Sequence, residues 1–451
     1  MTLGYRGSSV TSSIRRAGAY ALLGTLSVAA PAVGRVTVVL FAAVAVASLF
    51  VIEDGRLFEL FARPTDREDR TLYSLAAFSL AAAGLAILAT LFGMSIEVFV
   101  ASVLVLSYGH LAERLVRARW SAELASPVGF VCGGTLAGVA GQLLVLGIER
   151  GPTSEIAGTL PTAVFLAASG AVLGALLRSV LFAHDDPLVM LSIGLLLWLF
   201  AELSVSVSGL DITIALLLTV ILGAASYRLG TASIAGMLTG MLLVLLTTVL
   251  GGYDWFAVLI TFFAVGSLAA KYRIAEKRER GIAESNEGAR GSGNVLANAA
   301  VALGAVLAFA TSSLLGMAPA AFLFAFAGSL AAAMADTLSS ELGGLFDDPR
   351  LITTFERVPP GTDGGVTWQG ELAGLFGACL VAAVTGWSFE PVAFGGAVLI
   401  ALAGAAGMTV DSVLGATIEP RVGNQGVNFL ATLSAALVAT VAALAVGLVG
   451  F

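Results

Sequence analysis

The chain consists mainly of repeated apolar runs, each about 17–24 residues long and separated by short polar segments. A run of this length crosses a hydrocarbon core of roughly 30 Å as an α-helix, which rises about 1.5 Å per residue. The composition agrees, because 58% of the 451 residues are hydrophobic and only 12% are charged, whereas a soluble domain has about 25% charged residues. The pattern predicts an all-α, polytopic helical membrane protein rather than two or three soluble domains.

Apolar runs between charged breaks predict about 15 transmembrane helices. They lie near residues 17–33, 35–52, 71–92, 96–112, 128–148, 159–178, 188–207, 211–226, 231–250, 253–270, 294–316, 318–337, 370–387, 391–410 and 429–450. The 53 glycines are compatible with such a bundle, because glycine is tolerated in membrane helices and lets them approach closely.

The basic residues collect on one side of the membrane when these spans alternate. They lie in the segments 6–16, 56–70, 114–119, 271–290, 350–357 and at residue 421. Because cytoplasmic loops carry an excess of Lys and Arg, we expect this face to be the cytoplasmic face of the cell membrane, with the N-terminus inside. The net charge of −7 argues against a nucleic-acid partner, and the spacing of Cys132 and Cys379 supports neither a disulfide framework nor a zinc site.

Two apolar runs each end in an aspartate that is followed by a hydroxyl residue, at Asp336-Thr337 and Asp411-Ser412. Ser340 lies one helical turn beyond Asp336, on the same face. Carboxylates and hydroxyls suit a hydrated Mg²⁺ ion, which prefers one or two carboxylates and keeps several waters. We predict that Asp336 and Asp411 form the two halves of one metal–phosphate site. The alternative is a buried aspartate paired with an arginine.

Asparagines near two helix ends are candidate phosphate ligands. Asn294 and Asn298 stand four residues apart, on one face of the helix that follows the basic loop 271–290. Their amides and the helix N-terminus suit an anion, although a positive-inside anchor with an asparagine at the helix start is an alternative interpretation. Asn428 follows Asp411 in a second polar segment, 411–428.

The segment 350–371 is rich in glycine and proline. Gly364 and Gly365 leave the backbone free to adopt positive φ, and exposed N–H groups in such a loop can form an anion nest. Arg350 and Arg357 add positive charge beside it. These residues are therefore candidate phosphate ligands, although glycine-rich turns are common without such a role.

The usual nucleotide-binding and hydrolase patterns are absent from the sequence. It contains no G-x-x-x-x-G-K-[ST], no G-x-G-x-x-G and no G-x-S-x-G. A nucleotide, if one binds, would be held by an unconventional site at the membrane surface.

Six ordered motifs in the C-terminal half resemble the integral membrane family catalogued as domain of unknown function 92. They are NVLAN at 294–298, ADTLSSELG at 335–343, PRLITT at 349–354, VPPGTDGGVT at 358–367, DSVLGATIE at 411–419 and VNFLAT at 427–432. The family includes transmembrane protein 19 and a plant chloroplast phytyl-phosphate kinase. The resemblance covers residues 211–451.

This resemblance implies a membrane-embedded kinase that converts an isoprenoid monophosphate, of the phytyl- or geranylgeranyl-phosphate type, to the diphosphate. CTP or ATP would be the donor, and Asp336 and Asp411 would be the catalytic carboxylates that hold Mg²⁺. Because the acceptor is already an anion, positioning and charge neutralisation can carry the catalysis. The expected partners are the lipid bilayer, the isoprenoid phosphate and the nucleotide.

Two alternatives remain open at this point. A transporter or lipid-translocating protein would use the same polar helices as a pathway, and it should also place ionisable groups near the midplane of the membrane. A scaffold or lipid-binding protein without kinase activity predicts that replacing Asp336 or Asp411 by Asn leaves any lipid-linked phenotype unchanged.

Residues 1–210 lie outside the resemblance. Their segment YGHLAERLVR, at 108–117, resembles in degenerate form the GDxxAxxxG region of polyprenol kinases and phosphatidate cytidylyltransferases. We interpret this half as membrane helices of a divergent, inactive relative of those enzymes.

Overall fold

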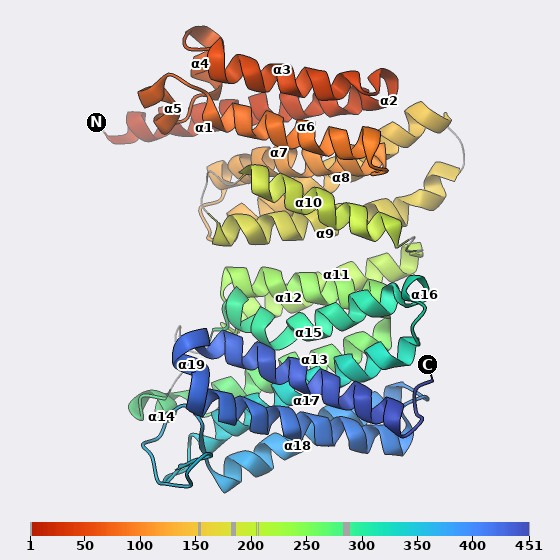
Figure 1. The fold of residues 1–451 in the computed structure, drawn as a ribbon. Helices are drawn as coiled ribbons and strands as arrows, with labels where there is room; N and C mark the ends of the chain where they lie inside the picture. Colours follow the sequence, from red (N-terminus) through yellow and green to blue (C-terminus); the bar gives the residue numbers. More distant parts are fainter. Residues whose placement is uncertain are drawn as a thin grey trace. The chain divides into compact units, whose positions relative to one another are not determined.

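The computed structural model describes residues 2–151, 155–181, 186–203, 205, 207–282 and 289–450, and Figure 1 shows its fold. The described residues are predominantly helical, with one small two-stranded sheet. Eleven of the helices are long and apolar enough to cross a membrane, or up to 12 spans if the bent pair α3 (Val36–Phe50) and α4 (Gly55–Phe61) counts as one. The prediction of an all-α, polytopic membrane protein is confirmed.

The expected count of about 15 spans is not confirmed. The first expected span falls on a broken stretch, α1 (Thr2–Thr25), η1 (Leu26–Ala29) and α2 (Ala30–Val33). Two others fall on α3 and α10 (Asp186–Glu202), which have 15 and 17 residues, fewer than the roughly 20 that a span usually needs. The last two expected spans share one element, the 53-residue α19 (Ala393–Ala445).

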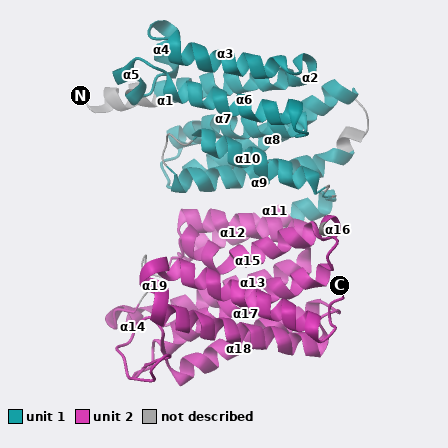
Figure 2. Ribbon diagram, viewed as in Figure 1, with its two compact units in different colours: residues 1–214 teal, residues 215–451 magenta. Residues whose placement is uncertain are grey.

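The chain divides into two compact units, residues 1–214 and 215–451, shown in Figure 2. The first unit also contains α5 (Pro64–Asp69), α6 (Tyr73–Leu91), α7 (Ile96–Arg119), α8 (Ala125–Arg150) and α9 (Glu155–Val180). The second contains α12 (Ile234–Leu246), η2 (Thr247–Gly251), α13 (Tyr253–Lys271), α14 (Ile274–Glu279), α15 (Ser292–Ala310), α16 (Ser312–Leu315), α17 (Pro319–Gly343), β1 (Arg350–Leu351), β2 (Gly365–Val366), α18 (Trp368–Ser388) and α19. The boundary falls within α11 (Gly209–Arg228).

Helix α7 forms the centre of the first unit. All ten residues from Val98 to Ser107 are buried. Its partner α8 presents small residues to it, and a Cβ added at Gly133 would lie 2.2 Å from the Cβ of Ala112. Glycines at such positions let two membrane helices pack with their backbones in close contact.

Helix α17 forms the centre of the second unit and is buried along most of its length. Helix α19 packs against it as two arms, because Gly423 has φ 71° and ψ 162° and breaks the helix between them. The arms contact each other as well as α17. A Cβ at Gly407 in the first arm would lie 2.5 Å from the Cβ of Ala332 on α17 and 2.9 Å from the Cβ of Ala435 in the second arm. This close contact sets the spacing of the helices that hold the polar residues.

The polar connections of the second unit gather at one end of its helices. Figure 1 shows α14, the loop that carries β1 and β2, and the bend of α19 at this end. The two strands are antiparallel, with Arg350 opposite Val366 and Leu351 opposite Gly365.

Candidate functional site

Asp336 and Asp411 meet inside the second unit. Helices α17 and α19 touch where Gly407 faces Ala332, and each aspartate follows this contact by four residues, about one helical turn. The two carboxyl groups consequently lie within hydrogen-bonding reach of each other. The sequence motifs are therefore brought together in space.

The two aspartates line a cavity of about 330 Å³. Eight of the residues singled out from the sequence line it: Asn294, Asn298, Asp336, Ser340, Gly364, Gly365, Asp411 and Asn428. They come from α15, α17, the loop before α18, and both arms of α19. Their roles as ligands stay predictions, but their placement in one cavity makes a shared site feasible.

Arg350 and Arg357 are not among the residues that line the cavity. Arg350 donates a hydrogen bond of 2.8 Å to the carbonyl oxygen of Phe355, within its own exposed loop. Arg357 lies 3.4 Å from Asp348, and both side chains are about two-thirds exposed. The loop therefore holds both arginines outside the cavity, and their predicted contact with phosphate remains a prediction.

The loop closes one wall of the cavity through Gly364, which has φ +74°. A Cβ at this position would lie 2.5 Å from the Cβ of Ala416 and 2.6 Å from the carbonyl oxygen of Ser412. Only glycine combines this backbone conformation with so close an approach. The loop backbone thereby rests on α19 one turn beyond Asp411.

Two oxygen atoms at the cavity are buried without a hydrogen-bond partner among the described residues, Oδ2 of Asp411 and Oδ1 of Asn294. A buried acceptor without a donor is costly, so such atoms need an explanation. The neighbouring amide of Asn298 does not supply the donor, because its Nδ2 donates at 3.0 Å to the backbone oxygen of Asn294. Unpartnered acceptors on two sides of a polar cavity fit a bound cation and its waters.

The charges around the cavity are mostly negative. Among the described lining residues, the carboxylates are Asp336, Glu341, Asp363, Asp411 and Glu419, and the one cationic side chain is Arg290. Glu341 is neutralised from outside the lining, because its Oε2 lies 2.5 Å from the Nζ of buried Lys277. Four carboxyl groups against one guanidinium provide little positive charge for a phosphate group, so we expect cations to accompany a phosphate at this cavity.

The donor set fits Mg²⁺. The described residues contain no group of three or more His, Cys, Asp and Glu side chains that could hold a metal ion by themselves. Mg²⁺ does not need one, because it is commonly held by one or two carboxylates and completes its shell with water and substrate phosphate oxygens. Asp336 and Asp411 would be those carboxylates.

Arg290 is a cavity residue that the sequence did not single out. It is 6% exposed, it donates to the Oγ1 of Thr337 at 3.4 Å, and its guanidinium lies 5.6 Å from the centre of the Phe262 ring. In the sequence it is one of several arginines in the basic loop. Its position directly before the glycine-rich start of α15 was the available signal.

Lys277 and Glu341 attach α14 to the cavity wall. Lys277 is 2% exposed, and besides contacting Glu341 it donates a hydrogen bond of 2.8 Å to the carbonyl oxygen of Ala269. That carbonyl belongs to the last turn of α13, where a cation is favourable. One buried lysine therefore joins α13, α14 and the end of α17.

Comparison with known proteins places the second unit in a defined group. The sequence profile described as integral membrane protein DUF92 matches residues 217–436. An uncharacterized membrane protein of Methanocaldococcus jannaschii is 36% identical over 188 residues, which are 40% of this chain and 73% of that protein. Protein VTE6, chloroplastic, of Arabidopsis thaliana is 31% identical over 199 residues, 44% of this chain and 59% of that protein. Protein PGR of the same plant is 32% identical over 227 residues, 46% of this chain and 78% of that protein. No solved structure matches the chain.

Proposed function

The chain belongs to the integral membrane protein family DUF92, and from this premise we propose that it phosphorylates an isoprenoid monophosphate, of the phytyl- or geranylgeranyl-phosphate type, to the diphosphate. The observation that carries the proposal is the meeting of Asp336 and Asp411 in one polar cavity among membrane helices. The resemblance to a family that includes a plant phytyl-phosphate kinase supports the substrate class.

In the proposed reaction, an oxygen of the acceptor phosphate forms a bond to the terminal phosphorus of CTP or ATP. The bond from that phosphorus to its bridging oxygen breaks, and the nucleoside diphosphate leaves. Mg²⁺ held by Asp336 and Asp411 would supply the charge that neutralises the phosphate oxygens. Arg290 adds one positive charge at the cavity wall, and the amides of Asn298 and Asn428 can donate hydrogen bonds.

The acceptor needs no general base, because its phosphate oxygens are already anionic. The isoprenoid chain would lie among the helices, whose surfaces are apolar, while the phosphate stays at the polar end. The excess of basic residues in the loops at this end supports a cytoplasmic orientation of the site.

The distribution of charge favours this proposal over a transport pathway. Helix α15, the part of α17 before Asp336 and the second arm of α19 (424–445) contain no Asp, Glu, Lys or Arg. A transporter is expected to place ionisable groups near the middle of the membrane. In the second unit such groups instead concentrate around the cavity and at helix ends.

The proposal is tested with purified full-length protein in detergent, Mg²⁺, radiolabelled CTP or ATP, and geranylgeranyl or phytyl monophosphate. We expect labelled diphosphate from the wild type and a loss of at least about 100-fold in Asp336→Asn and Asp411→Asn. Asp348→Asn is the matched control, because Asp348 is exposed and has φ 62°, a conformation that asparagine tolerates. Folded protein that gives no product with either donor and either chain length would contradict the proposal.

A further inference from the structure

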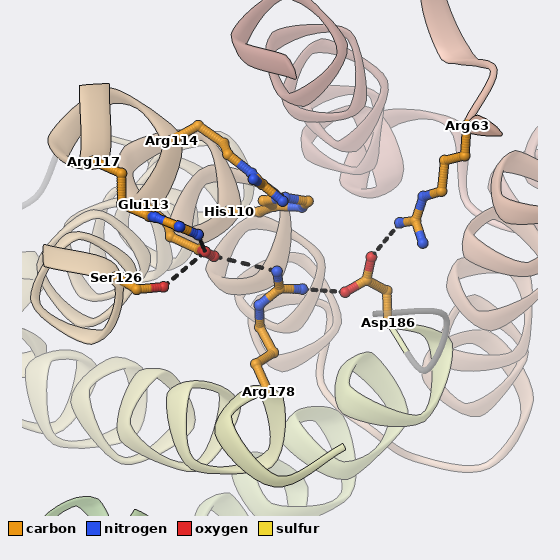
Figure 3. Close-up of polar contacts among 8 residues, drawn as sticks. All are labelled: Arg63, His110, Glu113, Arg114, Arg117, Ser126, Arg178 and Asp186. Carbon is orange, nitrogen blue, oxygen red and sulfur yellow. Dashed lines mark hydrogen bonds and ion pairs between the residues drawn. The ribbon is translucent and has the colours of Figure 1, made fainter. Parts of the chain in front are cut away.

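A group of half-buried arginines lies at one end of the first unit, in a part of the chain that precedes the DUF92 match at residues 217–436. Figure 3 shows Arg178 between Glu113 and Asp186, with Arg63 reaching Asp186 from the other side. Arg63 lies 2.6 Å from Asp186, and Arg178 lies 3.2 Å from Glu113 and also contacts Asp186. The side chains of Arg63 and Arg178 are only 15% and 16% exposed. These contacts join the residue that precedes α5 to α7, α9 and α10 around one charged centre.

Two further arginines face this centre without a carboxylate partner among the described residues. Arg114 donates from Nε to the Nε2 of His110 at 3.2 Å, so His110 acts as a neutral acceptor. Arg16 on α1 donates to the carbonyl oxygen of Ala62 at 2.8 Å. Arg16 and Arg114 are close enough to repel each other, and both feel the charge of Arg63.

The carboxylates do not balance these cations. The described residues at the centre provide five guanidinium groups, those of Arg16, Arg63, Arg114, Arg117 and Arg178, of which Arg117 lies 3.9 Å from Glu113. Against them stand the carboxylates of Glu113, Asp186 and Asp66, and the last of these also caps α5 by accepting from the backbone N–H of Arg63 at 2.9 Å. A positive excess in a partly dehydrated place is unfavourable unless an anion accompanies it.

A buried hydrogen-bond donor near these arginines also indicates that an anion binds here. The hydroxyl of Tyr20 is buried and has no hydrogen-bond partner among the described residues, and the residue is only 6% exposed. Tyr20 follows Arg16 by one helical turn, and its ring packs against Phe61 and Phe78. Its phenol lies within the electrostatic field of two arginines and two aspartates, Arg63, Asp66, Asp186 and Arg16. A buried O–H beside surplus arginines lacks an acceptor.

We propose that this end of the first unit binds a phosphate group, through Arg16, Arg114 and the hydroxyl of Tyr20. Guanidinium groups recognise phosphate with paired N–H donors, and charge-assisted hydrogen bonds of this kind are strong. The phosphate is either inorganic phosphate or the head of a lipid phosphate monoester, because the chemistry of the two is the same. No divalent cation is required, since the protein itself supplies the positive charge. The proposal is independent of the kinase activity.

The test is equilibrium dialysis of radiolabelled inorganic phosphate against the full chain in detergent with EDTA. EDTA removes the divalent cations without which the carboxylate-rich cavity of the second unit cannot hold phosphate, so the two sites are separated. We expect saturable binding in the wild type that is weakened about tenfold by Tyr20→Phe, the effect of losing one hydrogen bond to a charged group. Tyr108→Phe is the matched control, because its hydroxyl is engaged with Thr25 at 2.9 Å; it should bind phosphate like the wild type.

Tyr20→Phe removes a hydroxyl that makes no hydrogen bond among the described residues, so its thermal unfolding should match that of the wild type. Arg114→Gln serves as a second variant with weakened binding. Soluble geranyl monophosphate, added as a competitor, distinguishes the two possible ligands. If it binds more tightly than inorganic phosphate, the ligand is the head group of a lipid phosphate; if the two bind equally, the ligand is free phosphate. Absence of saturable binding in EDTA, or equal affinity of the wild type and Tyr20→Phe, would overturn the proposal.

Discussion

Replacing Gly407 by alanine should disable the candidate metal site without touching either aspartate. The added Cβ would lie 2.5 Å from the Cβ of Ala332, whereas apolar carbon atoms pack at about 3.5–4.0 Å. Relief of this overlap requires α17 and α19 to separate by roughly 1 Å. Asp336 and Asp411 lie one turn beyond the contact, so their carboxyl groups should separate by a similar amount.

A displacement of this size is large for metal chemistry. Metal–ligand distances are held within about 0.2 Å, and a misplacement of about 1 Å can cost 100-fold in rate. We therefore expect Gly407→Ala to lower diphosphate formation by about 100-fold and to weaken Mn²⁺ binding, measured by electron paramagnetic resonance with Mn²⁺ in place of Mg²⁺. The overpacked core should also lose about 1–3 kcal/mol of stability.

Gly395→Ala is the matched control, because Gly395 lies on the same arm of α19 and a Cβ there would meet nothing within 4 Å. It should retain activity and metal binding. The reasoning fails if Gly407→Ala binds Mn²⁺ and forms product like the wild type, or if both variants are impaired equally.

Three other perturbations have definite expected outcomes. Gly364→Ala should lower the midpoint of thermal unfolding by an amount equivalent to about 1–3 kcal/mol, because it combines a positive φ with overlap against Ser412; an unchanged midpoint would contradict the proposed fit of the loop on α19. Lys277→Met should cost about 3–5 kcal/mol, since it leaves Glu341 charged and largely buried, and adding Glu341→Met should restore much of the stability in the same unfolding assay. Chelation of divalent cations should abolish diphosphate formation and weaken the binding of prenyl monophosphate to the second unit. Prenyl monophosphate that still binds the cavity with its original affinity would exclude a metal-dependent site there.

The sequence predicted the membrane class and the two aspartates because both leave local signals. An apolar run is visible in composition, and a carboxylate at its end is rare enough to stand out. Asp336 and Asp411 also share their Asp-[Ser/Thr] context, which indicates a common role from the sequence alone. Their contact depends on the small side chains of Gly407 and Ala332. In a chain with 53 glycines, nothing in the sequence distinguishes these two residues from other small residues.

The sequence could not separate the arginines that enter the cavity from those that remain outside it. Arg290 and Arg350 both flank polar motifs, yet Arg290 is buried and Arg350 folds back on its own loop. The difference arises from the strand pairing of Arg350 with Val366, which is a long-range contact. The ends of some helices could not be predicted either. Hydropathy does not show, for example, that α3 ends at Phe50 and that the chain bends there before α4.

Because the two arms of α19 join directly at Gly423, the number of residues in the first arm determines which side chains of the second arm face the cavity. Glu419 and Asn424 lie on opposite sides of this break, and Asn428 follows in the second arm. All three line the cavity, and the helix resumes directly after Gly423. Since each helical residue turns its neighbours by about 100°, inserting a single residue between 419 and 423 would rotate one set of side chains out of the cavity. The loop tip at Phe355 is 68% exposed and lies outside the helices, so lengthening the chain there does not rotate either arm. An epitope or fluorophore intended to report membrane orientation should therefore be inserted at that tip, where the chain can lengthen while the two arms keep their angular register.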